Sequence, residues 1–323
     1  MQKNSSEEGL FVKILITGAD GFIGHNLVDY FISRNYSVLF PAMDELDLTD
    51  SVAVEKYFNI NSIDTIVHCA TTLRDGTSYP KGTCENNLRM FFNLQKQLTS
   101  SMRMINLGSG SEYDRKYWHK KMEEGFFDKH IPEDDHSYAK YLISKYISDT
   151  KNENIVCLRI FGVFGKYEDY RYKFISNTIV KNLFKMPIVI NQNVVYDYIY
   201  INDFARIVEY FVINNTKNKI FNVTTTESID LLTIANMINN VSDYISEIHI
   251  LNDGIGVEYT GDNNKLLSEI GDFKFTPQDE AITELRKYYF DIRETLDREA
   301  VQQDAYLDYA KNLHTNYFSR KTK

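Results

Sequence analysis

The first half of the chain alternates short apolar runs with segments whose apolar residues recur at helical spacing. Leu10–Thr17 is an apolar, β-branched run that predicts a buried parallel strand. The helix after it carries apolar residues along one face, namely Ile23, Leu27, Val28, Phe31 and Ile32. Further strands are predicted at Tyr36–Phe40, Thr65–Ala70, Met102–Leu107 and Ile155–Phe161, and helices at Ser51–Phe58, Asn86–Leu98 and Asp135–Asp149. Repeated β-α-β units predict an α/β fold, a doubly wound parallel Rossmann sheet with helices on both faces.

The pattern changes after about residue 165. Helices are predicted at Phe174–Leu183, Asp203–Val212 and Ile282–Tyr289, and strands at Ile188–Ile201, Lys219–Val223 and Glu247–Leu251. We therefore assign 1–165 to the Rossmann domain and 166–290 to a smaller α+β cap, with segments around 190–225 returning to the first domain. The charged stretch 291–323 predicts a helical extension, which is a surface helix, an oligomer contact or a solvated tail. Met1–Gly9 is predicted to be a disordered arm.

Composition narrows the class of protein. The chain has 323 residues, of which 43% are hydrophobic and 25% charged, and its net charge is −9. This acidic balance argues against a nucleic-acid partner, whose phosphates favour clustered Lys and Arg. No apolar run is long enough to span a membrane, and the N-terminus has no apolar signal core. Three separate cysteines without metal-ligand spacing predict a cytoplasmic protein with no metal site.

Three glycines lie in the turn between the first strand and the first helix, in the run Gly18-Ala-Asp-Gly21-Phe-Ile-Gly24. Gly18 permits a tight turn, Gly21 lets a pyrophosphate approach the backbone, and Gly24 lets the helix pack closely on the strand. The helix N-terminus offers N–H groups and partial positive charge to phosphates. An ordinary glycine-containing turn is the alternative, but the flanking strand and helix favour a dinucleotide site.

The second strand ends without a residue that would choose between the two nicotinamide dinucleotides. An acid there would bind the ribose 2′-hydroxyl of NAD and repel the 2′-phosphate of NADP. The chain has Leu39-Phe-Pro-Ala42 instead, with no Arg to bind the phosphate. The sequence therefore predicts NAD or NADP as the cofactor without deciding between them.

Tyr141 and Lys145 lie four residues apart on a predicted helix and so share one face. A free Tyr has a pKa near ~10, and a neighbouring ammonium would lower it toward neutral pH. Ser109, at the end of the preceding strand, is placed to hydrogen-bond the reacting oxygen. In a reduction, Tyr141 would donate a proton while a nicotinamide donates hydride. A surface Tyr and Lys on an amphipathic helix is the alternative.

Two other groups of residues are interpreted as structural rather than as functional sites. A second pair, Tyr117 and Lys121, comes too soon after the strand of Ser109 to lie on a crossover helix. The run from His130 to His136 collects possible metal ligands, but nothing fixes a tetrahedral geometry. We interpret it as a solvated loop and helix N-cap.

The order of these motifs resembles the extended short-chain dehydrogenase/reductase family, which comprises nucleotide-sugar epimerases, dehydratases and reductases, over roughly 12–289. The resemblance implies a catalytic triad of Ser109, Tyr141 and Lys145. It implies auxiliary roles for Ser111, Asn87 and Lys173. It implies a nucleotide-activated sugar as the substrate and a homodimer, as is common in the family. The implied cofactor-binding residues are Gly18, Gly21, Phe22, Ile23, Gly24, Asp47, Leu48, Cys69, Ala70 and Lys145.

Within this family, two segments are similar to GDP-fucose synthase-like ketosugar reductases: Met43–Asp50 and Leu107-Gly-Ser109. Dehydratases carry an Asp-Glu pair just after the catalytic Ser or Thr, where this chain has Gly110 and Ser111. Epimerising relatives use a Cys and a His, and the matching places hold Ser111 and, loosely aligned, Lys173.

Two residues that commonly serve the nucleotide diphosphate in the family are replaced by Tyr196 and Gly162. As a whole, the resemblance to ketosugar reductases predicts an NAD(P)-dependent 4-ketosugar reductase of cell-surface carbohydrate precursor synthesis. A nucleotide-sugar 4-epimerase and a non-catalytic dinucleotide-binding protein are the alternatives.

Overall fold

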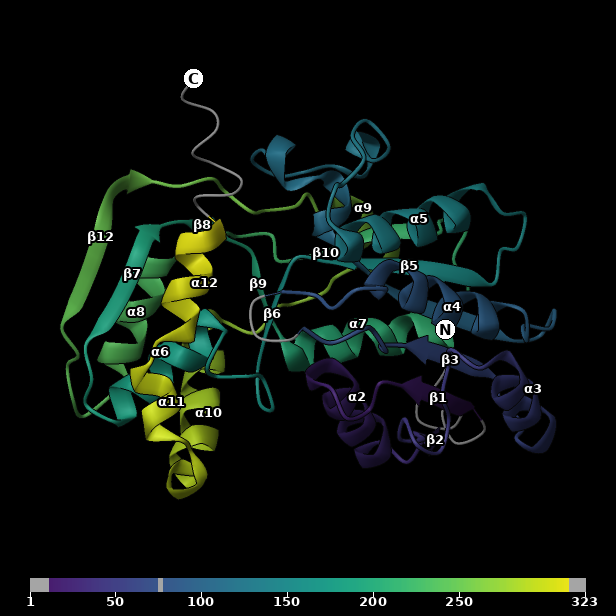
Figure 1. Ribbon diagram of the computed structural model, residues 1–323, viewed down its shortest axis with the longest axis horizontal. Coiled ribbons are helices and arrows are strands. Elements are labelled where there is room, and N and C mark those ends of the chain that lie inside the picture. The colour runs from purple at the N-terminus through teal and green to yellow at the C-terminus, as the bar shows by residue number, and fades with distance from the viewer. Residues whose placement is uncertain (1–11, 75–77, 314–323) are drawn as a thin grey trace.

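Six parallel strands form the central sheet, in the order β10-β5-β4-β3-β1-β2 (Figure 1). Their bounds are β1 (Lys13–Thr17), β2 (Ser37–Leu39), β3 (Thr65–His68), β4 (Arg103–Ser109), β5 (Ile155–Ile160) and β10 (Ile220–Val223). The computed structural model describes residues 12–74 and 78–313, so the predicted N-terminal arm lies outside the described residues. The strand order reverses between β1 and β3, which is where open parallel sheets bind ligands, at the carboxyl ends of the strands. The predicted fold class is confirmed.

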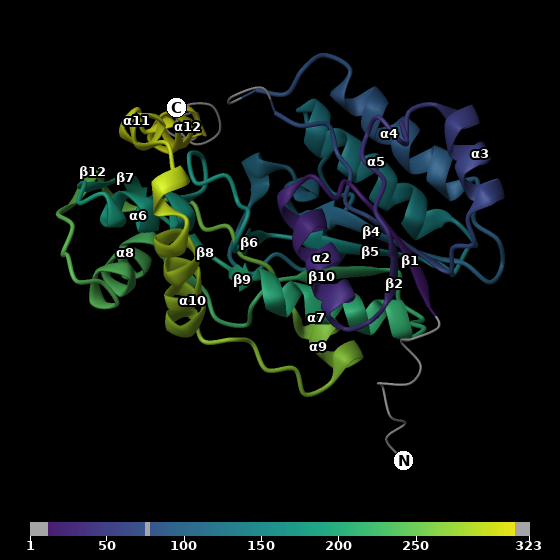
Figure 2. The ribbon, with the colours of Figure 1, turned by 90° about the horizontal axis from the view of Figure 1, so that it is seen from below.

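Helices cover both faces of the sheet because its strands are apolar on both sides. Successive residues of a strand point to opposite faces, so Ile14 and Ile16 pack in one core cluster and Leu15 in the other. One face is covered by α2 (Phe22–Ser33) and α7 (Ile201–Ile213), and the other by α3 (Ser51–Ile60), α4 (Thr83–Gln95) and α5 (Asp135–Asp149) (Figure 2).

The cap lies beside the sheet and is built mainly of helices around a parallel strand pair (Figure 1). Its helices are α6 (Phe174–Leu183), α8 (Leu231–Asn240) and α10 (Gln278–Asp291), and its strand pair is β7 (Ile188–Asn193) with β12 (Ile248–Ile255). Two short pairs connect the parts: β6 (Gly162–Phe164) with β9 (Tyr198–Tyr200), and β8 (Val195–Tyr196) with β11 (Ile229–Asp230). The chain returns to the sheet through α7 and β10, and α9 (Asn264–Ile270) packs next to β10.

The prediction of one strand over Ile188–Ile201 is wrong. The structure divides this run into β7, β8 and β9, and α7 begins at Ile201. Each strand pairs with a different partner: β12, β11 and β6. A continuous apolar run shows that a segment is buried, but it does not show where the segment changes its partner.

The C-terminal extension is helical and packed as far as it is described. It contains α11 (Arg298–Gln302) and α12 (Ala305–Leu313). Val301 is fully buried, and Lys181 Nζ of the cap lies 2.6 Å from a carboxylate oxygen of Asp304. These contacts exclude the solvated tail for the described part of the extension.

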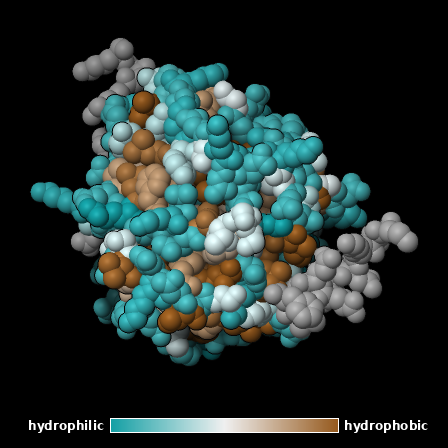
Figure 3. All heavy atoms as spheres, turned by 90° about the vertical axis from the view of Figure 1, so that its right-hand side faces the viewer, coloured by the Kyte–Doolittle hydropathy of each residue, from teal (hydrophilic) through white to brown (hydrophobic). Residues whose placement is uncertain are grey.

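The surface opposite the cap is mostly hydrophilic, with hydrophobic residues scattered over it (Figure 3). On α3, Val52 and Ile60 are 71% and 74% exposed. Singly exposed apolar residues are ordinary on protein surfaces, so they need no functional explanation. Among the described residues, no helix is both long and apolar enough to span a membrane.

Candidate active site

The glycine turn joins β1 to α2 at the carboxyl edge of the sheet. Gly18 has a φ of +69°, and a Cβ there would lie 2.7 Å from the backbone of Ala70. A Cβ on Gly24 would lie 2.1 Å from the carbonyl oxygen of Gly18. The N-cap of α2 is Gly21, which makes no side-chain cap, and the first turn of α2 carries no acid. This backbone cradle and uncapped helix N-terminus fit the pyrophosphate of a dinucleotide.

Gly24→Ala is expected to destabilise the protein by about 1–3 kcal/mol, because the new methyl group forces the turn away from α2. The same shift should weaken NADP(H) binding by roughly tenfold or more, which corresponds to about 1.4 kcal/mol. Gly125→Ala is the matched control, since a Cβ there meets no atom within 4 Å. Chemical unfolding and titration calorimetry measure the two effects. Equal dinucleotide affinity in the two variants would contradict the assignment.

The other predicted cofactor residues lie in loops after β2 and β3. The side chain of Asp47 accepts a hydrogen bond from the Thr49 amide (2.8 Å), and the carbonyl of buried Leu48 accepts one from Asn93 (2.8 Å). Cys69 and Ala70 directly follow β3. Burial raises the pKa of the Cys69 thiol to about 12, so this cysteine is no nucleophile at neutral pH.

The hydroxyl of Ser109 is held by the short helix η2 (Gly110–Tyr113) that follows β4. Ser109 Oγ accepts hydrogen bonds from the amide (3.1 Å) and hydroxyl (2.9 Å) of Ser111. The Ser109 amide donates to Glu112 Oε1 (2.8 Å), which completes a capping box. Ser109 also hydrogen-bonds the phenol of Tyr259. A serine fixed in this way at a strand end can orient a substrate oxygen.

Glu112 is committed to a buried ion pair. Its Oε2 lies 2.5 Å from Nε of Arg159, and both side chains are almost completely buried. Arg159 also donates to the phenol of Tyr113 (3.1 Å). The acid nearest to Ser109 in the sequence therefore stabilises the site and is not available for proton transfer.

Lys140 is the lysine that α5 turns toward the sheet. It is 8% exposed, and its amine donates to the carbonyl of Leu107 on β4 (2.6 Å). Burial lowers its pKa, while the charge of Glu112 opposes this effect. This buried amine lies beside the end of β4, the strand that carries Ser109. It is therefore placed to bind a ligand over the carboxyl edge of the sheet.

His136 lies one helical turn before Lys140 and on the same face of α5. Its ring stacks on Tyr79, with the ring centroids 4.4 Å apart. Burial lowers its pKa to about 3, and the charges of Lys140, Arg74 and Arg115 act in the same direction. The imidazole is therefore neutral at physiological pH. Its Nδ1 is buried and has no hydrogen-bond partner among the described residues.

The structure gives Tyr141 and Lys145 polar partners other than Ser109, so the predicted triad stays a prediction. The phenol of Tyr141 hydrogen-bonds Asp128, and the amine of Lys145 contacts Asp128 (2.8 Å) and Asp149 (3.5 Å). Lys145 is 41% exposed. Burial and the Asp128 carboxylate raise the pKa of Tyr141 to about 12, the opposite of the predicted shift. These two residues do share a helix face, but that face is turned away from Lys140 and the strand ends.

The remaining predicted residues lie in several environments. Ser111 is buried next to Ser109. Asn87 on α4 accepts from the Thr72 amide (2.8 Å) and so holds the loop after β3. Lys173 is exposed at the start of α6. Among the residues that the structure describes, no group of three or more His, Cys, Asp or Glu could hold a metal ion.

Lys121, from the second Tyr–Lys pair, forms an ion pair with Asp197 (3.1 Å). Asp197 is fully buried and also accepts from the Gly261 amide (2.9 Å). Tyr117 stacks on His130, with ring centroids 3.5 Å apart. Both members of this pair and the first histidine of the run therefore have structural partners.

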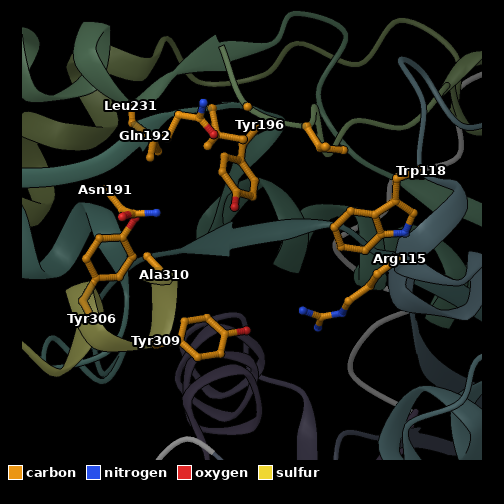
Figure 4. Close-up of a pocket in the computed structure, with 12 residues that line it drawn as sticks. Arg115, Trp118, Asn191, Gln192, Tyr196, Leu231, Tyr306, Tyr309 and Ala310 are labelled. Atoms are coloured by element: carbon orange, nitrogen blue, oxygen red, sulfur yellow. The ribbon is translucent and has the colours of Figure 1, made fainter. Parts of the chain in front are cut away.

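An aromatic wall stands next to Ser109. Trp118 stacks on Tyr259 with ring centroids 3.8 Å apart, and Tyr196 packs edge-on against Tyr259 at 5.9 Å. A Cβ on Gly110 would lie 2.5 Å from the phenol oxygen of Tyr259, so this glycine lets the wall approach the end of β4. Figure 4 shows Trp118 and Tyr196 around the adjoining pocket.

Comparison with curated proteins finds nucleotide-sugar enzymes. A GDP-6-deoxy-D-talose 4-dehydrogenase from Aggregatibacter actinomycetemcomitans is 25% identical over 297 residues, which cover 85% of this chain and 97% of that protein. A GDP-L-colitose synthase from Yersinia pseudotuberculosis is 23% identical over 184 residues, 53% of this chain and 60% of that protein.

Among solved structures, a GDP-L-fucose synthetase from Naegleria fowleri matches with a TM-score of 0.76 at 16% identity, covering 91% of this chain and 97% of that one. A GDP-L-fucose synthetase from the same organism has also been solved bound to NADP. At this identity the likeness shows the shared fold. The family model described as the NAD dependent epimerase/dehydratase family matches residues 14–224. The chain belongs to this family of NAD(P)-dependent nucleotide-sugar enzymes.

Proposed function

We propose that the chain reduces a nucleotide-linked 4-ketosugar, with Ser109, His136 and Lys140 at the reaction site. The observation that carries this proposal is the buried amine of Lys140, which contacts the Leu107 carbonyl two residues before Ser109. The family resemblance implies a Tyr four residues before the lysine. In this chain that place holds His136.

The roles follow from the environment of each side chain. The nicotinamide supplies hydride when bound, and the turn from Gly18 to Gly24 would hold its pyrophosphate, with Lys140 at the ribose. Ser109 orients the carbonyl oxygen of the sugar. His136 is neutral, so its imidazole N–H polarises that oxygen as a hydrogen-bond donor rather than as a strong acid, and water supplies the proton that completes the hydroxyl group.

The other two reactions of the family, dehydration and epimerisation, lack their acid and base residues in this chain. Gly110 and Ser111 stand where a dehydratase has an Asp-Glu pair, and Glu112 is bound to Arg159. Ser111 and the exposed Lys173 replace the Cys and His of epimerising relatives. Three of the similar proteins have names that refer to GDP-sugars, which supports a GDP-linked substrate.

One observation favours a second function, that of a nucleotide-sugar binding protein without turnover. His136 replaces the family's tyrosine, and its lowered pKa leaves it without the acidic proton of an imidazolium at neutral pH. Such a protein would keep the cofactor and substrate sites but not the proton donor.

The decisive experiment follows oxidation of NADPH or NADH in the presence of a GDP-linked 4-keto-6-deoxyhexose. We expect measurable turnover in the wild type and a rise of roughly 10–100-fold in His136→Tyr, because a positioned general acid contributes about 10²–10⁴-fold. Tyr141→Phe, which removes a phenol on the other face of α5, should change the rate less than about twofold, because that phenol bonds Asp128 and makes no contact with Ser109.

Absence of turnover in both the wild type and His136→Tyr, with both still binding NADPH and GDP, would reject the reductase and support the binding protein. Loss of turnover in Tyr141→Phe alone would reject the assignment of residue 136.

A further inference from the structure

The last described helix approaches the Rossmann domain with the side chain of Tyr309. The phenol of Tyr309 on α12 lies within reach of the charges of both Arg74 and Arg115, which lower its pKa. The guanidinium carbon of Arg74 lies 4.9 Å from the centroid of the Tyr309 ring. Figure 4 shows the hydroxyl of Tyr309 directed toward Arg115 across the pocket. Two cations from the first domain thus converge on one phenol from the C-terminal extension.

Both arginines lie next to the proposed reaction site. Arg74 follows β3, and its guanidinium carbon is 4.8 Å from the centroid of Tyr79, the ring that stacks on His136. Arg115 begins the short helix after η2, and its guanidinium carbon is 5.4 Å from the Trp118 ring. A ligand bound by this pair would therefore extend toward Ser109 and His136.

The charge of the pair suits an anion. Burial by itself would raise the pKa of Tyr309, but the charges of Arg115 and Arg74 outweigh it and lower the pKa to about 7. Tyr309 is therefore partly phenolate at neutral pH, and it occupies the place that an anionic ligand would take. Planar guanidinium groups match phosphate oxygens in two-point hydrogen bonds.

The pocket beside the pair is largely filled by α12. Its volume is about 80 Å³, with Tyr306, Tyr309 and Ala310 of α12 in its wall. Pockets that hold small-molecule ligands usually measure about 300–1,000 Å³. A nucleoside diphosphate therefore needs α12, or at least the side chain of Tyr309, to move.

The C-terminal extension is anchored to the cap at the start of α12. Asp304 links α11 to α12 with a φ of +55° and pairs with Lys181 of the cap. Tyr306 packs on Phe174, with ring centroids 5.4 Å apart. The anchor thus lies at the start of α12, whereas Tyr309 lies at its middle.

We propose that Arg74 and Arg115 bind the diphosphate of the substrate, and that Tyr309 occupies this site until the substrate displaces it. The substrate class rests on the proposed function. The family's usual diphosphate-binding Arg is replaced in this chain by Tyr196, which lines the same pocket. Arg115, which lines that pocket, and Arg74 supply the missing positive charge.

The test is titration of GDP, with guanosine as the uncharged probe, into the NADP⁺-bound protein. Arg115→Met should weaken GDP binding by about tenfold or more, in line with the loss of a charge-assisted contact. Arg74→Gln is the second variant, should Arg115→Met fail to fold. Tyr309→Phe should strengthen GDP binding severalfold, because the competing hydroxyl is gone. Guanosine affinity should not change in the arginine variants.

Tyr210→Phe is the control, since its phenol bonds the Glu269 carbonyl away from the pocket. Its GDP affinity should equal that of the wild type. Weaker or unchanged GDP binding in Tyr309→Phe would show that Tyr309 does not compete with the diphosphate. Unchanged GDP binding in both arginine variants would show that Arg74 and Arg115 do not bind it. These readouts need no turnover, so they stand or fall separately from the reductase assay.

Discussion

Replacing Lys140 by methionine is expected to lower turnover of a GDP-linked 4-ketosugar by about 10²-fold or more. The amine is the buried cation next to the strand of Ser109, and positioned groups of this kind contribute about 10²–10⁴-fold. The protein should still fold, because an apolar chain of similar length replaces a buried charge. Steady-state kinetics and circular dichroism test both statements.

Lys145→Met is the matched control on the same helix. Its amine is exposed and contacts Asp128 and Asp149, so turnover should stay within about twofold of the wild type. The reverse result, with loss of turnover in Lys145→Met and none in Lys140→Met, would return the catalytic role to the Tyr141–Lys145 pair.

Arg159→Met is expected to lower the free energy of unfolding by about 3–5 kcal/mol, because it leaves the carboxylate of Glu112 buried without its partner. Tyr113 also loses a hydrogen-bond donor. Urea unfolding measures the change. The double variant Glu112→Gln/Arg159→Met should recover part of the loss, since no buried charge then remains.

Arg89→Met provides the comparison for an exposed ion pair. Arg89 pairs with Glu85 four residues earlier on α4 at 2.8 Å, and both side chains are more than half exposed. Its loss should cost at most about 0.5 kcal/mol. An equally small change in the free energy of unfolding for Arg159→Met would show that the buried Glu112–Arg159 pair does not stabilise the turn after β4.

The parallel sheet could be predicted from the sequence because strands buried on both faces are continuous apolar runs. β1, β3, β4 and β5 each lie within their predicted segments or within two residues of them. The cap was predicted less well. Helix α8 was missed, and three strands were merged, because short segments with changing partners leave no distinct period. Helices α11 and α12 lie within the predicted helical extension.

The positions of Ser109 and the three glycines could be predicted, because both depend on a local turn next to a strand. The orientation of Tyr141 and Lys145 on α5 follows from the position of the apolar face of the helix. Ala139, Ile143 and Ile147 recur every four residues and pack toward the sheet.

At about 100° per residue, His136 and Lys140 project within about 60° of the centre of that stripe, whereas Tyr141 and Lys145 project about 160° away from it. On α5, the expected Tyr-x-x-x-Lys spacing is matched in residue type by Tyr141 and Lys145. The lysine that faces the sheet has a histidine in the tyrosine's place.

The contact of Tyr309 with Arg74 and Arg115 could not be predicted from the sequence. The three residues come from the loop after β3, the turn after β4 and the last described helix. No local pattern connects positions so far apart in the chain. Only the packing of α12 against the cap brings the phenol to the two arginines.

The most direct test of the account is a crystal structure of the chain with NADP(H) bound. We expect the amine of Lys140 to contact the nicotinamide ribose and the imidazole of His136 to face the nicotinamide ring. Tyr141 should remain hydrogen-bonded to Asp128. A complex in which Tyr141 and Lys145 contact the cofactor, with Lys140 remote from it, would contradict the account.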